Sequence, residues 1–183
     1  MVSTDDDEIA DIALTGGAKV PFRRSRETSD DHATTAQVLD EVLREYESRG
    51  RIFEYTCCLY PTAPFVTAEQ LRTAFTRLTE TGADSVIPVA RFSFPICRAF
   101  QMEKGRLTYI WPENAPKRSQ DLQTTFHDAG QFYFFRTVPF LETGQLVGPN
   151  SVGLETEELE VQDIDTEQDW KLAELKYRLL SGD

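Results

Sequence analysis

Two aspartates near the end of the chain, Asp163 and Asp165, are separated by a single apolar residue, Ile164. Because side chains alternate in extended chain, both carboxylates would lie on one side and Ile164 on the other. Paired carboxylates suit a hard divalent cation such as Mg²⁺, which commonly shares its coordination with substrate phosphates. The alternative is structural, with Asp163 in a turn and Asp165 as the N-cap of the next helix. The residues by themselves leave both interpretations open.

Basic residues gather in two short segments of an otherwise acidic chain. Arg23, Arg24 and Arg26 follow a predicted short strand, and Lys117 and Arg118 lie in the long loop before the segment GQFYFF. In open α/β sheets the loops at the carboxyl ends of strands surround the ligand, and guanidinium groups bind phosphate or carboxylate bidentately. Both segments could therefore contact an anionic small molecule. Alternatively, they are surface residues that offset the negative charge.

Thr34 and Thr35 begin a predicted helix, where free backbone N–H groups and hydroxyls can bind an anion or a ribose. Equally, Thr34 can serve only as the N-cap. The chain has no GxxxxGK[ST] motif and no GxGxxG motif. A nucleotide-binding role would therefore need another way to hold the phosphates.

The elements that would position these residues alternate between short apolar runs and amphipathic stretches, a pattern typical of an α/β fold. Helices are predicted over residues 5–14, 35–48, 67–81 and 166–180, and strands over 19–22, 53–60, 83–90 and 130–135. We expect N-terminal capping by Thr4 with Asp7 in the first helix, and by Thr67 and Thr166 in the third and fourth. The run FEYTCCLY is apolar enough for a strand covered on both faces.

From Arg98 onward the pattern changes. Apolar and polar residues alternate on either side of Lys104-Gly105, which predicts an antiparallel hairpin. We therefore expect one Rossmann-like domain over residues 1–183, with a mostly parallel sheet, helices on both faces and residues 96–135 as an inserted region.

Composition excludes several classes of protein. A chain of 183 residues with 40% hydrophobic residues is long enough for one buried core. The formal net charge of −12 argues against binding to nucleic acid or to an anionic membrane, since both need a basic surface. No apolar run approaches the roughly 20 residues of a membrane span, and three cysteines without disulfide spacing fit a reducing cytoplasm.

Several longer segments resemble the acylneuraminate cytidylyltransferases, and within that family the members that act on pseudaminic acid. The resemblance spans essentially the whole chain and is carried by KVPFRRSRETSDDHATTAQVL, ADSVIPVARFSFPI, WPENAPKRSQDLQTTFHDAGQFYF and ELEVQDIDTEQDWKLAELKY. It implies that the anomeric hydroxyl of a nonulosonic acid attacks the α-phosphorus of CTP and releases pyrophosphate, for cell-surface glycan or flagellin glycosylation. It also implies a homodimer formed through the inserted hairpin.

The resemblance gives individual residues a role in the nucleotide half of the reaction. Asp163 and Asp165 match the family's metal-binding pair and would hold Mg²⁺. Arg24, and Thr34 or its neighbour Thr35, match positions that contact the cytidine nucleotide.

Other residues match the sugar half. Arg118 matches a basic residue that faces the carboxylate of the sugar acid, and Tyr60 and Tyr133 match positions lining that pocket. Tyr60 replaces a Gln of the neuraminate enzymes, and Ala129 stands where they have Asn. Both departures weigh against N-acetylneuraminate as the substrate, while another nonulosonic acid or a 3-deoxy-octulosonic acid stays open.

The sequence departs from the family pattern at the start of the chain. Family members begin with a strand, a Gly-, Ser-, Arg- and Lys-rich loop that holds the triphosphate, and a helix. This sequence opens on Met1-Val2-Ser3-Thr4, which matches the family's next strand. We therefore expect the first βα unit to be missing and the 183 residues alone to have little or no transferase activity. The alternative function is an inactive remnant that binds sugar or pairs with a full-length homologue.

Overall fold

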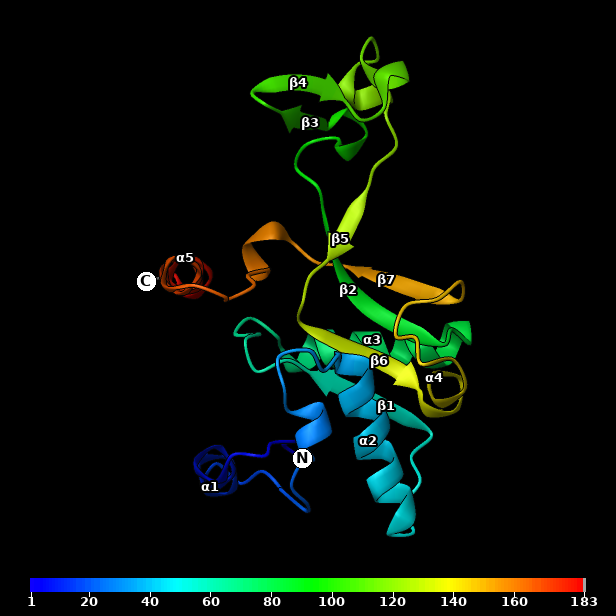
Figure 1. Cartoon of the computed structure of the whole chain (residues 1–183), viewed down its shortest axis with the longest axis vertical. Coiled ribbons are helices and arrows are strands. Elements are labelled where there is room, and N and C mark those ends of the chain that lie inside the picture. The colour runs from blue at the N-terminus through cyan, green and yellow to red at the C-terminus, as the bar shows by residue number, and fades with distance from the viewer. Residues whose placement is uncertain (183) are drawn as a thin grey trace.

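The computed structural model describes residues 1–182, and its centre is a five-stranded sheet (Figure 1). Its strands are β1 (Tyr55–Leu59), β2 (Ser85–Arg91), β5 (Phe126–Asp128), β6 (Phe132–Arg136) and β7 (Ser151–Glu155). The start of β2 pairs with β6 and its end with β5, while β7 pairs with most of β2, from Ser85 to Val89. β1 pairs with β6 and lies at the edge of the sheet.

The sheet is mixed, so the prediction of a mostly parallel sheet is wrong. β6 runs antiparallel to both β1 and β2, β5 also runs antiparallel to β2, and among the described residues only β2 and β7 pair in parallel. The chain leaves β2 through a long excursion and returns through β5 and β6 in the opposite direction, as in a long hairpin. The α/β class itself is confirmed.

Helices cover both faces of this sheet, as predicted (Figure 1). They are α2 (Thr35–Ser48) and α4 (Thr137–Thr143) on one face and α3 (Ala68–Thr81) on the other. The alternation of β6 divides its aromatic residues between the two faces: Phe132 and Phe134 pack toward α3, and Tyr133 and Phe135 toward α2 and α4. Both layers of the core therefore depend on this one strand.

Local capping sets where three of the helices begin. The predicted capping boxes form, with Thr67 and Gln70 opening α3, and Thr166 and Asp169 opening α5 (Glu167–Ser181). A third box, with Thr34 as N-cap, opens α2. In each box a threonine hydroxyl accepts a hydrogen bond from a free N–H of the first turn. Within residues 1–182, no helix combines the length and apolarity that crossing a bilayer requires.

The first helix, α1 (Asp7–Thr15), starts differently from the prediction. Asp6 is its N-cap and accepts a hydrogen bond from the Ile9 N–H, while Thr4 accepts from the Asp6 N–H just before the helix. The strand predicted over residues 19–22 does not form. Two backbone bonds, from the Val2 N–H to Lys19 and from the Arg24 N–H to Thr4, join these segments without making a ladder.

The strand β1 is covered less than its apolar sequence predicts. Cys57 and Leu59 point to the α3 face, yet both are exposed because β1 is the edge of the sheet. Cys58 points to the opposite face and packs against the core beneath α2, where burial raises the pKa of its thiol to about 11. The prediction that both faces of this strand are covered is therefore wrong.

An arm rises from the sheet between β2 and β5 (Figure 1). It carries the predicted hairpin, formed by β3 (Phe100–Glu103) and β4 (Arg106–Tyr109). Lys104 and Gly105 both have positive φ, 49° and 78°, which is the type I′ geometry preferred in two-residue hairpin turns. Within residues 1–182, the single-turn 3₁₀ helices are η1 (Arg26–Thr28), η2 (Ile96–Arg98), η3 (Pro112–Asn114), η4 (Ser119–Asp121) and η5 (Glu158–Glu160).

Candidate functional site

Three of the predicted site residues meet at the start of α2. Tyr60, which follows β1, shares a hydrogen bond of 2.8 Å between its hydroxyl and the hydroxyl of Thr35. The ring of Tyr60 lies 5.5 Å from the ring of Tyr133 on β6, with an interplanar angle of 66°. The antiparallel pairing of β1 with β6 brings these two tyrosines together. The structure therefore unites Thr35, Tyr60 and Tyr133, which we call the tyrosine cluster.

A residue that the sequence reasoning missed, Asp128, completes this cluster. The hydroxyl of Tyr133 donates to its carboxylate, and the Gly130 N–H donates to Oδ1 at 2.8 Å. Burial and the neighbouring carboxylate raise the pKa of Tyr133 well above its ordinary value, so its hydroxyl keeps its proton at neutral pH. The signal in the sequence was an Asp two residues before a Gly, which is a common turn pattern.

The turn at Gly130 also brings the aspartate pair close to the tyrosine cluster. Gly130 has φ of +63°, and a β-carbon added to it would lie 3.8 Å from the carboxylate of Asp163. Asp163 and Asp165 are exposed, whereas Ile164 is half-buried and lines an apolar pocket with Phe65. The alternation predicted for this segment is therefore present.

The structural alternative for the aspartate pair is wrong for Asp165. Thr166 is the N-cap of α5, and the hydrogen bonds made by the pair use backbone atoms: the Asp163 carbonyl accepts from Gln162, and the Asp165 N–H donates to Asp169. Both carboxylates are thus available to a ligand.

The aspartate pair by itself supplies only two metal ligands. No group of three His, Cys, Asp or Glu side chains within residues 1–182 is close enough to hold a metal ion. Mg²⁺ is commonly bound by one or two carboxylates together with water and substrate phosphates. Two exposed aspartates therefore fit a cation that a phosphate ligand would help to hold.

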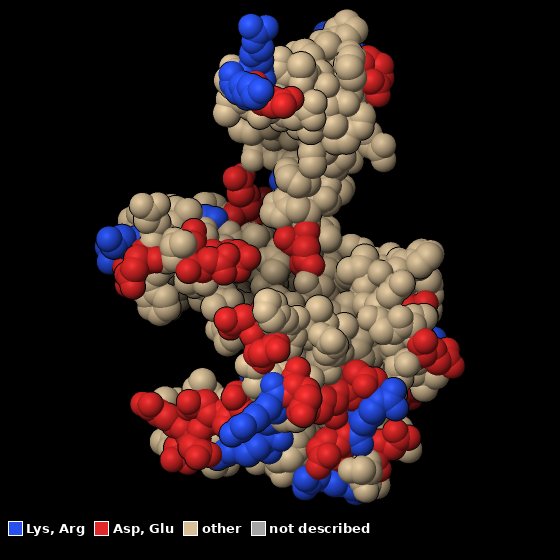
Figure 2. Space-filling view, viewed as in Figure 1, with Lys and Arg blue, Asp and Glu red and all other residues tan. Residues whose placement is uncertain are grey.

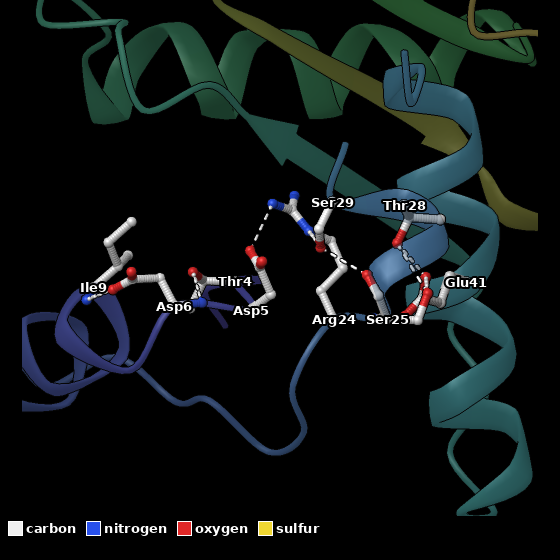
Figure 3. A network of polar contacts seen from close by, with 9 residues as sticks. All are labelled: Thr4, Asp5, Asp6, Ile9, Arg24, Ser25, Thr28, Ser29 and Glu41. Atoms are coloured by element: carbon white, nitrogen blue, oxygen red, sulfur yellow. Dashed lines mark hydrogen bonds and ion pairs between the residues drawn. The ribbon is translucent and has the colours of Figure 1, made fainter. Parts of the chain in front are cut away.

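Arg24 lies in a separate polar network beside α2 (Figure 3). Its Nε donates to the hydroxyl of Ser29 at 3.0 Å, and its Nη2 lies 3.5 Å from Asp5. Glu41 on α2 accepts from the N–H and the hydroxyl of Ser25, at 2.7 and 2.8 Å, and from the hydroxyl of Thr28. Burial acts to raise the pKa of Glu41, but these hydrogen bonds together hold it below its ordinary value.

Arg118 is not brought into contact with the tyrosine cluster. It lies on the arm just before η4, with its side chain 73% exposed and its guanidinium bound to Asp121 at 2.8 and 3.2 Å. Its neighbour Ser119 lines a wide cleft of about 610 Å³ between the base of the arm and the end of β7, together with Arg91 and Glu157. The role of Arg118 toward a sugar acid therefore stays a prediction.

The surface charge is predominantly acidic, with the basic groups confined to small islands. Figure 2 shows basic side chains over the region of α1 and α2, surrounded by acidic ones. Within this region Arg23 pairs with Asp7 at 2.8 Å, so one arginine of the predicted basic segment is engaged by a neighbouring carboxylate. Arg24 is the more enclosed of the two, with 24% of its side chain exposed against 43%.

The known proteins that this chain resembles are cytidylyltransferases. A family model described as "Cytidylyltransferase" matches residues 1–145. The chain is 35% identical over 180 residues to the pseudaminic acid cytidylyltransferase of Campylobacter jejuni subsp. jejuni serotype O:2, covering 98% of the chain and 78% of that relative. It is 33% identical to N-acylneuraminate cytidylyltransferase A of Danio rerio, over 94% of the chain and 39% of that relative.

A solved structure supports the fold. The structure of CMP:2-keto-3-deoxy-manno-octonic acid synthetase complexed with CTP matches with a TM-score of 0.61 and 15% identity, covering 100% of this chain and 80% of that chain. At that identity the likeness concerns the fold alone.

Proposed function

The chain belongs to the cytidylyltransferase family, and we propose that it joins the CMP part of CTP to pseudaminic acid with release of pyrophosphate. The observation that carries this proposal is the exposed aspartate pair beside the tyrosine cluster, in a chain 35% identical to a pseudaminic acid cytidylyltransferase. An inactive remnant is not favoured, because the matching relatives cited above are named as enzymes.

The nucleotide would lie between Arg24 and the start of α2. Arg24 supplies a positive charge for the phosphates, and the first turn of α2 presents backbone N–H groups at the positive end of the helix dipole. The hydroxyl of Thr34 is engaged in the capping box, so its contribution would come from its position at the helix start. Thr35 would lie between the nucleotide and the sugar acid, since it begins α2 and its hydroxyl shares a hydrogen bond with Tyr60.

Asp163 and Asp165 would bind Mg²⁺ together with the phosphates of CTP. The cation, when bound, would neutralise the charge that develops on the phosphate oxygens. The carboxylates themselves need no rearrangement, because neither is engaged within the described chain and the backbone around them is held by the capping box of α5. The proximity of Asp163 to Gly130 would place the reacting phosphate beside the tyrosine cluster.

The sugar acid would lie against Tyr60 and Tyr133. The Tyr133 hydroxyl donates a hydrogen bond to Asp128, so its oxygen offers the sugar a lone pair, and its ring offers an apolar surface. Arg118 would pair with the carboxylate of the sugar and give up its ion pair with Asp121. Breaking that pair would cost little free energy, because exposed ion pairs contribute little to stability. Tyr60 in place of Gln favours pseudaminic acid over N-acetylneuraminate.

The direct test is product formation. With CTP, pseudaminic acid and Mg²⁺, we expect mass spectrometry to detect CMP-pseudaminic acid, and we expect no product in EDTA or without either substrate. N-acetylneuraminate and 3-deoxy-octulosonic acid serve as competing acceptors. The Campylobacter relative, assayed in parallel, gives the reference rate. A product formed preferentially with another acid would overturn the substrate assignment.

We propose that the arm makes a homodimer. Phe100 pairs with Tyr109, and Met102 with Leu107, so all four apolar side chains share one face of the hairpin. Met102 is 72% and Leu107 60% exposed, although the rings of Phe100 and Tyr109 pack 4.4 Å apart. An apolar two-stranded ribbon needs a covering surface, and a second copy related by a two-fold axis would supply an identical one.

Replacing Met102 by Glu is expected to convert a dimer to a monomer, because a charge would be buried without a partner at the centre of the apolar face. Sedimentation velocity at several concentrations measures the outcome. Thr108→Glu is the matched control, since Thr108 lies on the same hairpin but on the opposite face. A wild-type chain that stays monomeric at high concentration, or equal dissociation by both variants, would refute this arrangement.

A further inference from the structure

Arg24 is oriented through a relay of hydrogen bonds that begins on α2 (Figure 3). Glu41 binds both the N–H and the hydroxyl of Ser25. The carbonyl of Ser25 accepts from the hydroxyl of Ser29 at 2.6 Å, and the same hydroxyl accepts from Nε of Arg24 at 3.0 Å. The direction of the guanidinium therefore depends on where Glu41 holds Ser25.

The relay leaves part of Arg24 available. Its Nε is bound to Ser29 and its Nη2 lies 3.5 Å from Asp5, a long contact for an ion pair. Nη1 makes no hydrogen bond within residues 1–182 and is not a buried orphan. Three of the four residues that fix the loop, Ser25, Thr28 and Ser29, are small hydroxyl residues that offer no charge to a ligand. Arg24 is thus the group that this loop presents.

Helix geometry relates this relay to the start of α2. Glu41 follows Thr34 by seven residues, which is two turns to within about 20°, so both lie on the same side of the helix about 10 Å apart along its axis. The loop fastened to Glu41 therefore runs beside the face of α2 that ends at Thr34. One rigid helix sets the spacing between Arg24 and the first turn.

We propose that Glu41 is a positioning residue of the nucleotide site, which holds Arg24 in register with the N-terminus of α2. This inference rests on the proposed binding of CTP by Arg24. Glu41 itself would not contact the nucleotide, because its carboxylate is engaged by Ser25 and Thr28. Its loss would let the loop move away from the helix and carry Arg24 out of register.

The test is a double-mutant cycle on CTP affinity, measured by calorimetry with Mg²⁺ present. We expect Glu41→Ala and Arg24→Ala each to weaken binding of CTP about tenfold, and the double variant to bind no more weakly than Arg24→Ala alone, since both remove the same interaction. Glu41→Gln keeps the shape and an acceptor oxygen, so it should restore affinity to within about threefold of wild type. Affinity for the sugar acid should not change in any of them.

Asp40→Asn is the matched control, because it removes a neighbouring carboxylate of α2 that pairs with Arg44 at 2.7 Å. It should bind CTP like the wild type. Additive losses in the double variant, or wild-type affinity in Glu41→Ala, would refute the role of Glu41 and leave the proposed function standing. Wild-type affinity in Arg24→Ala would remove both Arg24 and Glu41 from the nucleotide site. Failure of the wild-type chain to bind CTP, when the Campylobacter relative binds it, would count against both proposals.

Discussion

Replacing Asp165 by Asn is expected to lower the rate of CMP-sugar formation by at least about 100-fold while leaving the fold unchanged. Within residues 1–182 the proposed metal site has two protein carboxylates, so the loss of one removes half of the charge that they supply. The carboxylate of Asp165 makes no hydrogen bond to the described chain, so stability should not depend on it. The experiment measures initial rates at several Mg²⁺ concentrations and the melting temperature of each variant.

Glu167→Gln is the control for the loss of one negative charge in the same segment. Glu167 is exposed in the first turn of α5 and has no part in the proposed site. Its rate should match the wild type. If Asp165→Asn keeps the wild-type rate at low Mg²⁺, Asp165 does not bind the metal. If it loses both rate and melting temperature, the segment around α5 has a structural role that the exposed carboxylate does not indicate.

Replacing Phe132 by Ala is expected to destabilise the chain by about 3–5 kcal/mol, the usual cost of emptying a fully packed aromatic site. Phe132 is 1% exposed and packs between the sheet and α3, against Leu78 and Val86. Because single domains are stable by only about 5–15 kcal/mol, this variant should unfold at much lower urea concentration or fail to fold. Urea denaturation followed by circular dichroism measures the change.

The strand β1 supplies a matched control. Leu59 pairs directly with Phe132 and points to the same face, yet it is 52% exposed. Leu59→Ala should therefore cost no more than about 1 kcal/mol. A loss of stability close to that of Phe132→Ala would mean that the face of β1 carrying Leu59 is covered in solution. It would contradict the exposure of Leu59 at the edge of the sheet.

The elements that the sequence predicted well are those controlled by short-range interactions. The helix over residues 35–48 and the capping boxes at Thr67 and Thr166 form where predicted, because each depends on residues within one turn of helix. The hairpin at Lys104-Gly105 forms for the same reason, since two residues determine its turn. Thr4 failed as a cap because Asp6, two residues later, makes the competing bond.

The candidate site was predicted as residue types but not as an arrangement. The alternation of Asp163, Ile164 and Asp165 follows from extended chain, and Tyr60 and Tyr133 were assigned through the family resemblance. Asp128 and Glu41 were missed because they are two of 31 acidic residues; the only local pattern at Asp128 is a common turn pattern, and Glu41 has none. Their partners, Tyr133 for Asp128 and Ser25 for Glu41, identify them only in the folded chain.

The sequence by itself determined where the three helices with capping boxes begin, which residues are apolar and that the aspartate pair would share one side. Only the tertiary structure decided that β6 lies antiparallel between β1 and β2, and that Asp163 lies near Gly130. The physical reason is that a period of two is the same for a strand in either direction, so strand order and direction come from how the long connection through the arm returns to the sheet.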